Sequence, residues 1–178
     1  LERWIQEGAP WAAHWAFVPP KRPVLPEVGD PGWCRNDIDR FVLARQEAKN
    51  IAPNAEADKR TLVRRIYLDM TGLPPTPERV EAFVNDVAPD AYEKLIDEVL
   101  ASPHYGERWG RHWLDVARYA DSNGYEHDFD RPNAWRYRDY VIQSFNKDTP
   151  FDVFLTEQLA GDEMGERTYD RLIATAFL

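Results

Sequence analysis

The segment from Pro103 to about Ala120 carries the side chains most able to do chemistry. At helical spacing its apolar residues fall in one arc of about 120°, and an imidazole lies among the aromatic rings. The members of this arc are Tyr105, Trp109, His112, Trp113, Val116, Tyr119 and Ala120. His112 is either a core imidazole with a satisfied N–H, or a haem or metal ligand or proton carrier. The sequence leaves these alternatives open.

The candidate cofactor-binding residues all lie in this segment. They are His112, His104, Trp109 and Tyr105. The two histidines are eight residues apart, which on a helix is about 12 Å of rise. Metal–nitrogen bonds are only about 2 Å long, so the two imidazoles cannot share one metal. Gly106 and Gly110 flank the arc, and each costs roughly 1 kcal/mol against Ala in a helix interior. That cost indicates close approach of another backbone or of a flat ligand.

An acidic loop, residues 121–130, offers oxygen ligands of the kind that calcium prefers. Its candidate metal ligands are Asp121, Asn123, Glu126 and Asp128. The loop is not an EF-hand, because its glycine falls at position four and no Glu occupies position twelve. A solvated loop built on turn chemistry is the alternative to a calcium site. An acid–base pair of Asp121 with Glu126 is a further option that the spacing does not select.

Rings alternate with charges in residues 135–140. One interpretation is cation–π and ion-pair packing that joins helices. The functional alternative is a carbohydrate-binding platform, since Trp and Tyr faces stack on pyranose rings while charged groups bind hydroxyls. The candidate ligand-binding residues are Trp135, Arg136, Tyr137 and Arg138.

Composition excludes several classes of protein. The 178 residues are 43% hydrophobic and include 7 Trp, 8 Tyr and 8 Phe, too many for a disordered chain. The formal net charge of −9 disfavours binding to nucleic acid, and no apolar run is long enough for a membrane span. Cys34 is the single cysteine, so an internal disulfide, a Cys-rich zinc site and a Cys-x-x-Cys-His haem attachment are excluded within these residues.

Apolar periodicity and cap residues predict an all-α fold, an irregular bundle of about seven or eight helices. No Val/Ile/Thr alternation of the strand type occurs. After a short N-terminal turn, the helices are expected at 36–48, about 62–72, 76–84, 92–100, 103–120, 135–145, 149–161 and 169–178.

The chain divides into three parts. Residues 1–11 are expected to be the tail of a preceding cytochrome-like domain. Residues 12–35 are rich in proline and predict an extended strap anchored by its aromatic rings. Residues 36–178 are expected to form the helical domain, which we expect to continue past Leu178 because the last residues are apolar and uncapped.

Several motifs in order resemble one family, a planctomycete cytochrome-associated domain of unknown function. This is the second planctomycete cytochrome-type domain, of the PSCyt family. The motifs are His14–Phe17, Ile38–Ala44, Asp69–Pro77, Ser102–Asp115, Ala134–Asp139 and Glu157–Asp162. Leu1 to Trp11 resembles the tail of the c-type cytochrome domain that precedes it in such proteins.

The resemblance implies a large exported, multidomain protein, periplasmic or at the cell surface. Relatives carry a Cys-x-x-Cys-His stretch beyond this point, so we expect no cofactor within this chain and haem c on adjacent parts. Expected partners are neighbouring domains, above all a c-type cytochrome domain. The leading hypothesis is an accessory domain associated with electron transfer; the alternatives are a carbohydrate-binding or carbohydrate-processing module and a purely structural scaffold between domains.

Overall fold

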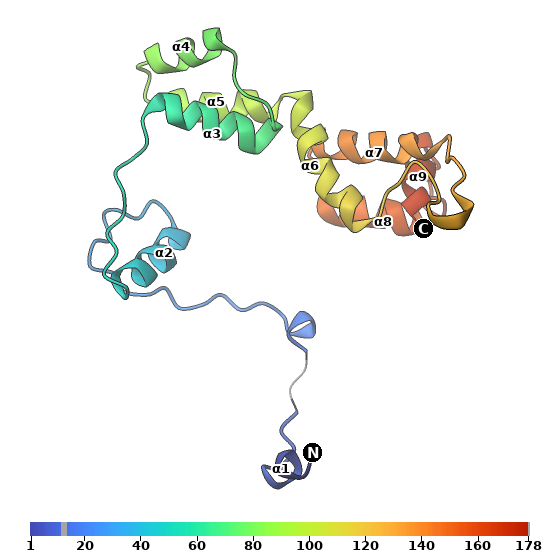
Figure 1. The fold of residues 1–178 in the computed structure, drawn as a ribbon, viewed down its shortest axis with the longest axis horizontal. Coiled ribbons are helices and arrows are strands. Elements are labelled where there is room, and N and C mark those ends of the chain that lie inside the picture. Colours follow the sequence, from blue (N-terminus) through green and yellow to red (C-terminus); the bar gives the residue numbers. More distant parts are fainter. Residues whose placement is uncertain (12–13, 178) are drawn as a thin grey trace. The chain divides into compact units, whose positions relative to one another are not determined.

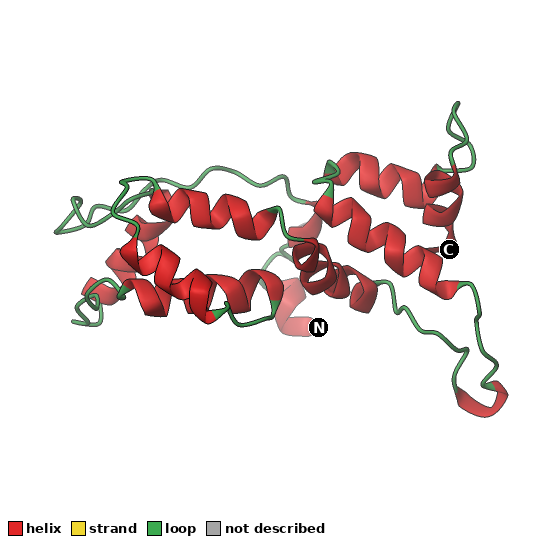
Figure 2. Ribbon diagram, turned by 90° about the horizontal axis from the view of Figure 1, so that it is seen from above, coloured by secondary structure: helices red, strands yellow, loops and turns green. Residues whose placement is uncertain are grey.

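Helices make up the regular structure of the computed structural model, which describes residues 1–11 and 14–177 (Figures 1 and 2). The α-helices are α1 Glu2–Gln6, α2 Asp37–Glu47, α3 Lys59–Thr71, α4 Pro77–Asn85, α5 Ala91–Leu100, α6 Pro103–Val116, α7 Ala134–Asn146, α8 Phe151–Ala160 and α9 Tyr169–Ala174. Short 3-10 turns cover Trp15–Phe17, Tyr125–His127 and Thr175–Phe177. The described ranges contain no strand, only an isolated bridge between Ser122 and Asp130. The prediction of an all-α fold is confirmed.

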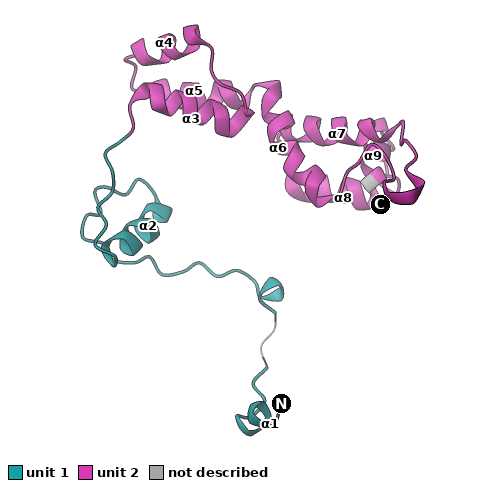
Figure 3. Ribbon diagram, in the orientation of Figure 1, with its two compact units in different colours: residues 1–56 teal, residues 57–178 magenta. Residues whose placement is uncertain are grey.

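The chain forms two compact units, Leu1–Glu56 and Ala57–Leu178 (Figure 3). In the first unit, residues 19–28 have no regular structure, as the prolines predicted. The rings of Trp11, Trp15 and Phe17 are exposed. Residues 12 and 13 of the predicted strap lie outside the described residues, and the three predicted domain boundaries stay predictions.

Asn36 caps helix α2, at the position where the sequence predicted the helix to start. The Asn36 side chain accepts hydrogen bonds from the backbone N–H groups of Ile38 and Asp39, and Asp39 in turn accepts from the N–H of Asn36. This capping box satisfies donors that the first helical turn leaves without intrahelical partners. Leu43 is the buried residue of this helix.

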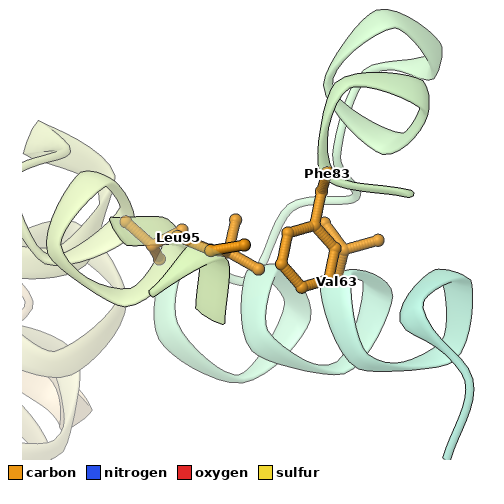
Figure 4. Packing of buried hydrophobic residues seen from close by; sticks show 5 residues of the cluster. Val63, Phe83 and Leu95 are labelled. Atoms are coloured by element: carbon orange, nitrogen blue, oxygen red, sulfur yellow. The ribbon is translucent and has the colours of Figure 1, made fainter. Parts of the chain in front are cut away.

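The second unit contains two apolar clusters, and the first joins α3, α4 and α5. Val63, Phe83 and Leu95 meet at its centre (Figure 4). Sequence signals set the ends of these helices: Gly72 ends α3 with a left-handed φ of 73°, and Thr76 caps α4 with Pro77 at the first helical position. None of the described helices is long and apolar enough to span a bilayer.

Two glycines bring α6 against α7. Gly106 and Gly110 are both buried, and a Cβ on Gly106 would overlap the carbonyl oxygen of Ile142. The Gly106 N–H donates to Asn146 Oδ1 at 2.7 Å, and the Asn146 amide donates to the Pro103 carbonyl at 3.1 Å. Of the two explanations that the sequence offered for these glycines, the structure shows close approach of another backbone.

The second cluster lies between α7, α8 and α9 and has a polar centre. Its buried apolar members are Tyr137, Tyr140, Val141, Phe154 and Ala174. Gln158 is only 1% exposed, and its Oε1 accepts from Trp113 Nε1 at 2.9 Å and from the Tyr137 hydroxyl at 2.5 Å. These hydrogen bonds tie α6, α7 and α8 together, since each helix supplies one partner.

Several helix ends differ from the prediction. Helix α6 ends at Val116 rather than near Ala120, because Arg118 takes a left-handed φ of 54° and the Tyr119 N–H bonds back to Leu114. This is a Schellman end with an arginine in the place that glycine normally takes. The helix predicted from residue 149 begins at Phe151, with Pro150 as its N-cap and no side-chain hydrogen bond at the cap. Helix α9 ends at Ala174, and Leu178 lies outside the described residues.

Candidate functional site

A polar cleft beside α7 and α9 is the most fully built candidate site. The Arg136 guanidinium lies 5.4 Å from the ring centroid of Trp135 and 5.8 Å from that of Tyr169. Arg136 also donates a hydrogen bond to the Tyr169 hydroxyl. Cation–π attraction to both rings and this hydrogen bond hold the arginine in place. The two rings themselves are partly solvent-exposed, Trp135 by 46% and Tyr169 by 60%.

Two hollows of about 110 Å³ and 220 Å³ share a wall formed by Tyr140, Gln143 and Asp170. The smaller hollow is lined by Trp135, Arg136, Asp139, Tyr140, Gln143, Tyr169, Asp170 and Ile173. The larger adds Ser144, Lys147, Thr149, Glu157, Thr168 and Arg171. The cleft therefore combines aromatic rings with amide, carboxylate, hydroxyl and guanidinium groups.

Ion pairs and hydrogen bonds fix the floor of this cleft. The Tyr140 hydroxyl donates to Glu157 Oε2 at 2.9 Å, and Arg171 Nε donates to Glu157 Oε1 at 3.3 Å. Burial, and then the Glu157 carboxylate, raise the pKa of the Tyr140 phenol. The hydrogen bond to Asp139, which lines the smaller hollow, raises the pKa of Arg138, which lines neither hollow. These raised pKa values keep the Tyr140 phenol protonated and the Arg138 guanidinium charged at neutral pH.

The predicted ligand-binding platform is only partly assembled. Trp135 and Arg136 line the cleft, and Arg138 pairs with Asp139 at 2.9 Å. Tyr137 is 5% exposed and lies in the second cluster, so its ring is not available to a ligand at the surface. Tyr169 stands beside Arg136 instead. No local sequence pattern indicates this pairing, because Tyr169 comes from a different helix 33 residues later.

The predicted cofactor-binding residues lie along α6 in a row of rings. The Tyr105 and Trp109 centroids are 6.2 Å apart, and those of Trp109 and His112 are 5.5 Å apart. His112 is exposed, so its interpretation as a core imidazole is wrong. His104 is also exposed, and its Nδ1 lies 2.7 Å from Glu107 Oε2. Trp109 Nε1 is buried without a hydrogen-bond partner among the described residues.

Two of the four predicted metal ligands of the acidic loop accept hydrogen bonds from groups in the loop or just before it. Asp121 Oδ1 accepts from the Tyr119 hydroxyl at 2.5 Å, and burial together with this carboxylate raises the pKa of Tyr119 to about 12. Asp128 Oδ1 accepts from the Gly124 N–H at 2.8 Å, and hydrogen bonds from Ser122 and Gly124 lower the pKa of Asp128.

Turn chemistry therefore accounts for Asp121 and Asp128. Asn123 and Glu126 are exposed. In the part of the chain that the structure describes, no three His, Cys, Asp or Glu side chains gather as a metal site would require. The calcium site stays a prediction.

A family model matches most of the chain. Residues 37–178 match the model of the PSCyt2 family, which is described as a protein of unknown function (DUF1549). No curated protein and no solved structure matches the chain. The matched range begins at the first residue of α2 and includes the cleft, the aromatic row on α6 and the acidic loop.

Proposed function

Since the chain belongs to the PSCyt2 family, whose function is unknown, we propose from the cleft that it is an accessory binding domain and that its ligand is a carbohydrate. The observation that carries this proposal is the arginine held between two partly exposed rings, Trp135 and Tyr169, at a polar cleft. An arrangement of this kind meets the two requirements of a sugar site, a flat apolar surface and fixed polar groups around it.

The lining matches the chemistry of a pyranose. One face of the sugar ring presents C–H groups that pack against aromatic faces, while its hydroxyls donate and accept hydrogen bonds. Asp139 and Asp170 offer acceptors, Arg136 offers donors, and Gln143 offers both. The cleft is open to solvent at both rings, as a site for a chain-like polysaccharide needs to be.

Trp135→Ala is expected to weaken carbohydrate binding by about ten-fold or more, because it removes one stacking face and the ring that holds Arg136. The measurement is a glycan-array screen of the 178-residue chain, followed by isothermal titration calorimetry with the best ligand. Tyr125→Ala is the matched control, since Tyr125 is an aromatic residue 90% exposed in the acidic loop and does not line the cleft.

Both variants should keep the wild-type circular dichroism spectrum. A screen that finds no binding across neutral and anionic polysaccharide classes, or an equal loss in Tyr125→Ala, would contradict the proposal.

We place this domain in a large exported protein that carries c-type haem in a neighbouring domain. The family name and the resemblance of residues 1–11 to a cytochrome tail support that setting. Its proposed partners are the neighbouring domains of the same polypeptide. Exposed apolar side chains on α8 and α9, such as Leu159 and Leu172, support packing against other domains.

A role beside haem is the second candidate function, and the exposed His112 favours it. Its imidazole is accessible from outside the domain and lies against Trp109. In the full reading frame, produced in a host that matures c-type cytochromes, His112→Ala should shift the visible haem spectrum if the imidazole reaches the iron. His104→Ala is the control, because its ring already pairs with Glu107. If His112→Ala leaves the visible haem spectrum unchanged, His112 is not a haem ligand.

A further inference from the structure

An apolar pocket of about 300 Å³ lies where α6, the end of α7 and the start of α8 meet. Five aromatic residues line it: Tyr105, Trp113, Phe145, Phe151 and Phe154. The other lining residues are Ser144, Asp148, Thr149 and Pro150, so Asp148 is the one formally charged group among the described residues of the wall. An aromatic box with a single carboxylate has a specific chemical preference.

Ring-to-ring packing fixes the shape of this box. Trp113 packs edge-to-face on Phe154, with centroids 5.0 Å apart, and on Phe151, with centroids 6.3 Å apart. Phe145 also packs edge-to-face on Phe154 at 6.3 Å. The Trp113 indole N–H is anchored in turn by Gln158. The pocket is therefore preorganised, and this reduces the entropic cost of binding a ligand.

The backbone fixes Asp148 at the rim. Its φ is 50°, its N–H donates to the Phe145 carbonyl at 3.1 Å, and the next N–H, of Thr149, donates to Ser144 at 3.0 Å. Together these bonds form a Schellman end on α7. Asp148 is exposed and forms no ion pair among the described residues, while the adjacent Lys147 pairs with Asp170 at 3.6 Å.

Helix dipoles do not decide the charge preference of the pocket. The carbonyl end of α7 and the amide end of α8 both reach it, and their partial charges are opposite in sign. The Asp148 carboxylate and the aromatic quadrupoles remain, and both favour a positive charge. A strongly hydrated ion such as an alkali metal would gain little from an apolar wall, whereas a methylated ammonium gains from both the rings and the carboxylate.

We propose that this pocket binds an organic cation with a compact apolar body, of the trimethylammonium type. The pocket shares Ser144 and Thr149 with the larger hollow of the cleft but no residue with the smaller hollow beside Trp135 and Tyr169, so this proposal is tested separately from carbohydrate binding. Quaternary ammonium groups are held by aromatic cages of this composition.

The test is titration calorimetry of the 178-residue chain with choline and with its neutral carbon isostere, 3,3-dimethyl-1-butanol. Choline is expected to bind about ten-fold more tightly than the isostere. Asp148→Asn should weaken choline binding about ten-fold and leave the isostere unchanged; Asn tolerates the left-handed conformation, so the end of α7 is kept. Asp162→Asn, at an exposed carboxylate outside the pocket, is the matched control and should change neither ligand.

Phe151→Leu supplies a second variant, because it keeps apolar volume while removing an exposed ring. It should weaken choline more than the isostere. Equal affinity for choline and the isostere would show a general apolar pocket and overturn the proposal. Absence of choline binding at millimolar concentrations would overturn it as well.

Discussion

Gly106→Ala is expected to lower the free energy of unfolding by about 1–3 kcal/mol, the usual range for overpacking a tight contact. The added methyl group would overlap the Ile142 carbonyl oxygen and the side chain of Asn146. The Asn146 side chain can rotate away, although it would then lose its bond to the Gly106 N–H. The carbonyl is part of α7 itself, so relief requires the two helices to separate.

Gly110→Ala is the matched control on the same face of the same helix. A Cβ there would have its nearest neighbours at 3.5 Å, on Ile142 and Val141, which is ordinary van der Waals contact. Alanine is favoured over glycine in a helix interior by about 1 kcal/mol, so this variant should be neutral or slightly stabilised.

Urea denaturation followed by far-UV circular dichroism measures both changes. If Gly106→Ala and Gly110→Ala change the free energy of unfolding equally, α6 and α7 do not approach each other closely at Gly106.

Helix starts could be predicted from the sequence because their signals are local. Asn36, Thr76 and Ser102 each accept a hydrogen bond from a backbone N–H within the next three residues, and this geometry needs no tertiary contact. The end of α3 at Gly72 is equally local, since glycine adopts positive φ without strain. These features explain why the all-α fold and most helix bounds agree with the sequence.

Ends without glycine could not be predicted in the same way. Arg118 takes a left-handed conformation that ends α6, although arginine gives no local signal for such an end. The tertiary contacts of α6 outweigh the local preference there. For the same reason the predicted length of α6 was too great.

The large apolar residues of α6 predicted its packed face only in part. The large apolar residues indicated a core arc through His112 and Val116, yet His112 is exposed and Val116 is 71% exposed. Trp113 of the arc packs in the second cluster, and Gly106 and Gly110, where the sequence indicated close approach of a backbone, let α7 approach. Large apolar side chains mark the buried face of a helix only where the partner helix packs at the usual interaxial distance.

The candidate cleft was half predictable. Trp135 and Arg136 lie on it as proposed from the alternation of rings and charges, but successive residues on a helix point about 100° apart. Tyr137 therefore turns into the core, and the pattern alone does not say which ring does so. The second ring of the cleft, Tyr169, depends on the contact of α9 with α7, which is long-range in sequence.

Gln158→Leu is expected to lower the free energy of unfolding by about 1–3 kcal/mol, although leucine has a similar volume. The substitution removes the acceptor that Trp113 Nε1 and the Tyr137 hydroxyl share at 2.9 Å and 2.5 Å. Gln158 is 1% exposed, so water cannot replace that acceptor without opening the core. Gln143→Leu, at an exposed glutamine on α7, should stay within about 0.5 kcal/mol of wild type.

A double-mutant cycle with Tyr137→Phe separates hydrogen bonding from packing. Tyr137→Phe removes both a donor to Gln158 and the hydroxyl that accepts from Trp113 Nε1 at 3.0 Å, so the effects of the two substitutions on the free energy of unfolding should not be additive. Urea denaturation at neutral pH gives the four unfolding free energies, and tryptophan fluorescence reports on the surroundings of Trp113. If the two substitutions were strictly additive, the shared acceptor would not be what stabilises the junction of α6, α7 and α8. Packing alone would then have to account for the burial of Gln158.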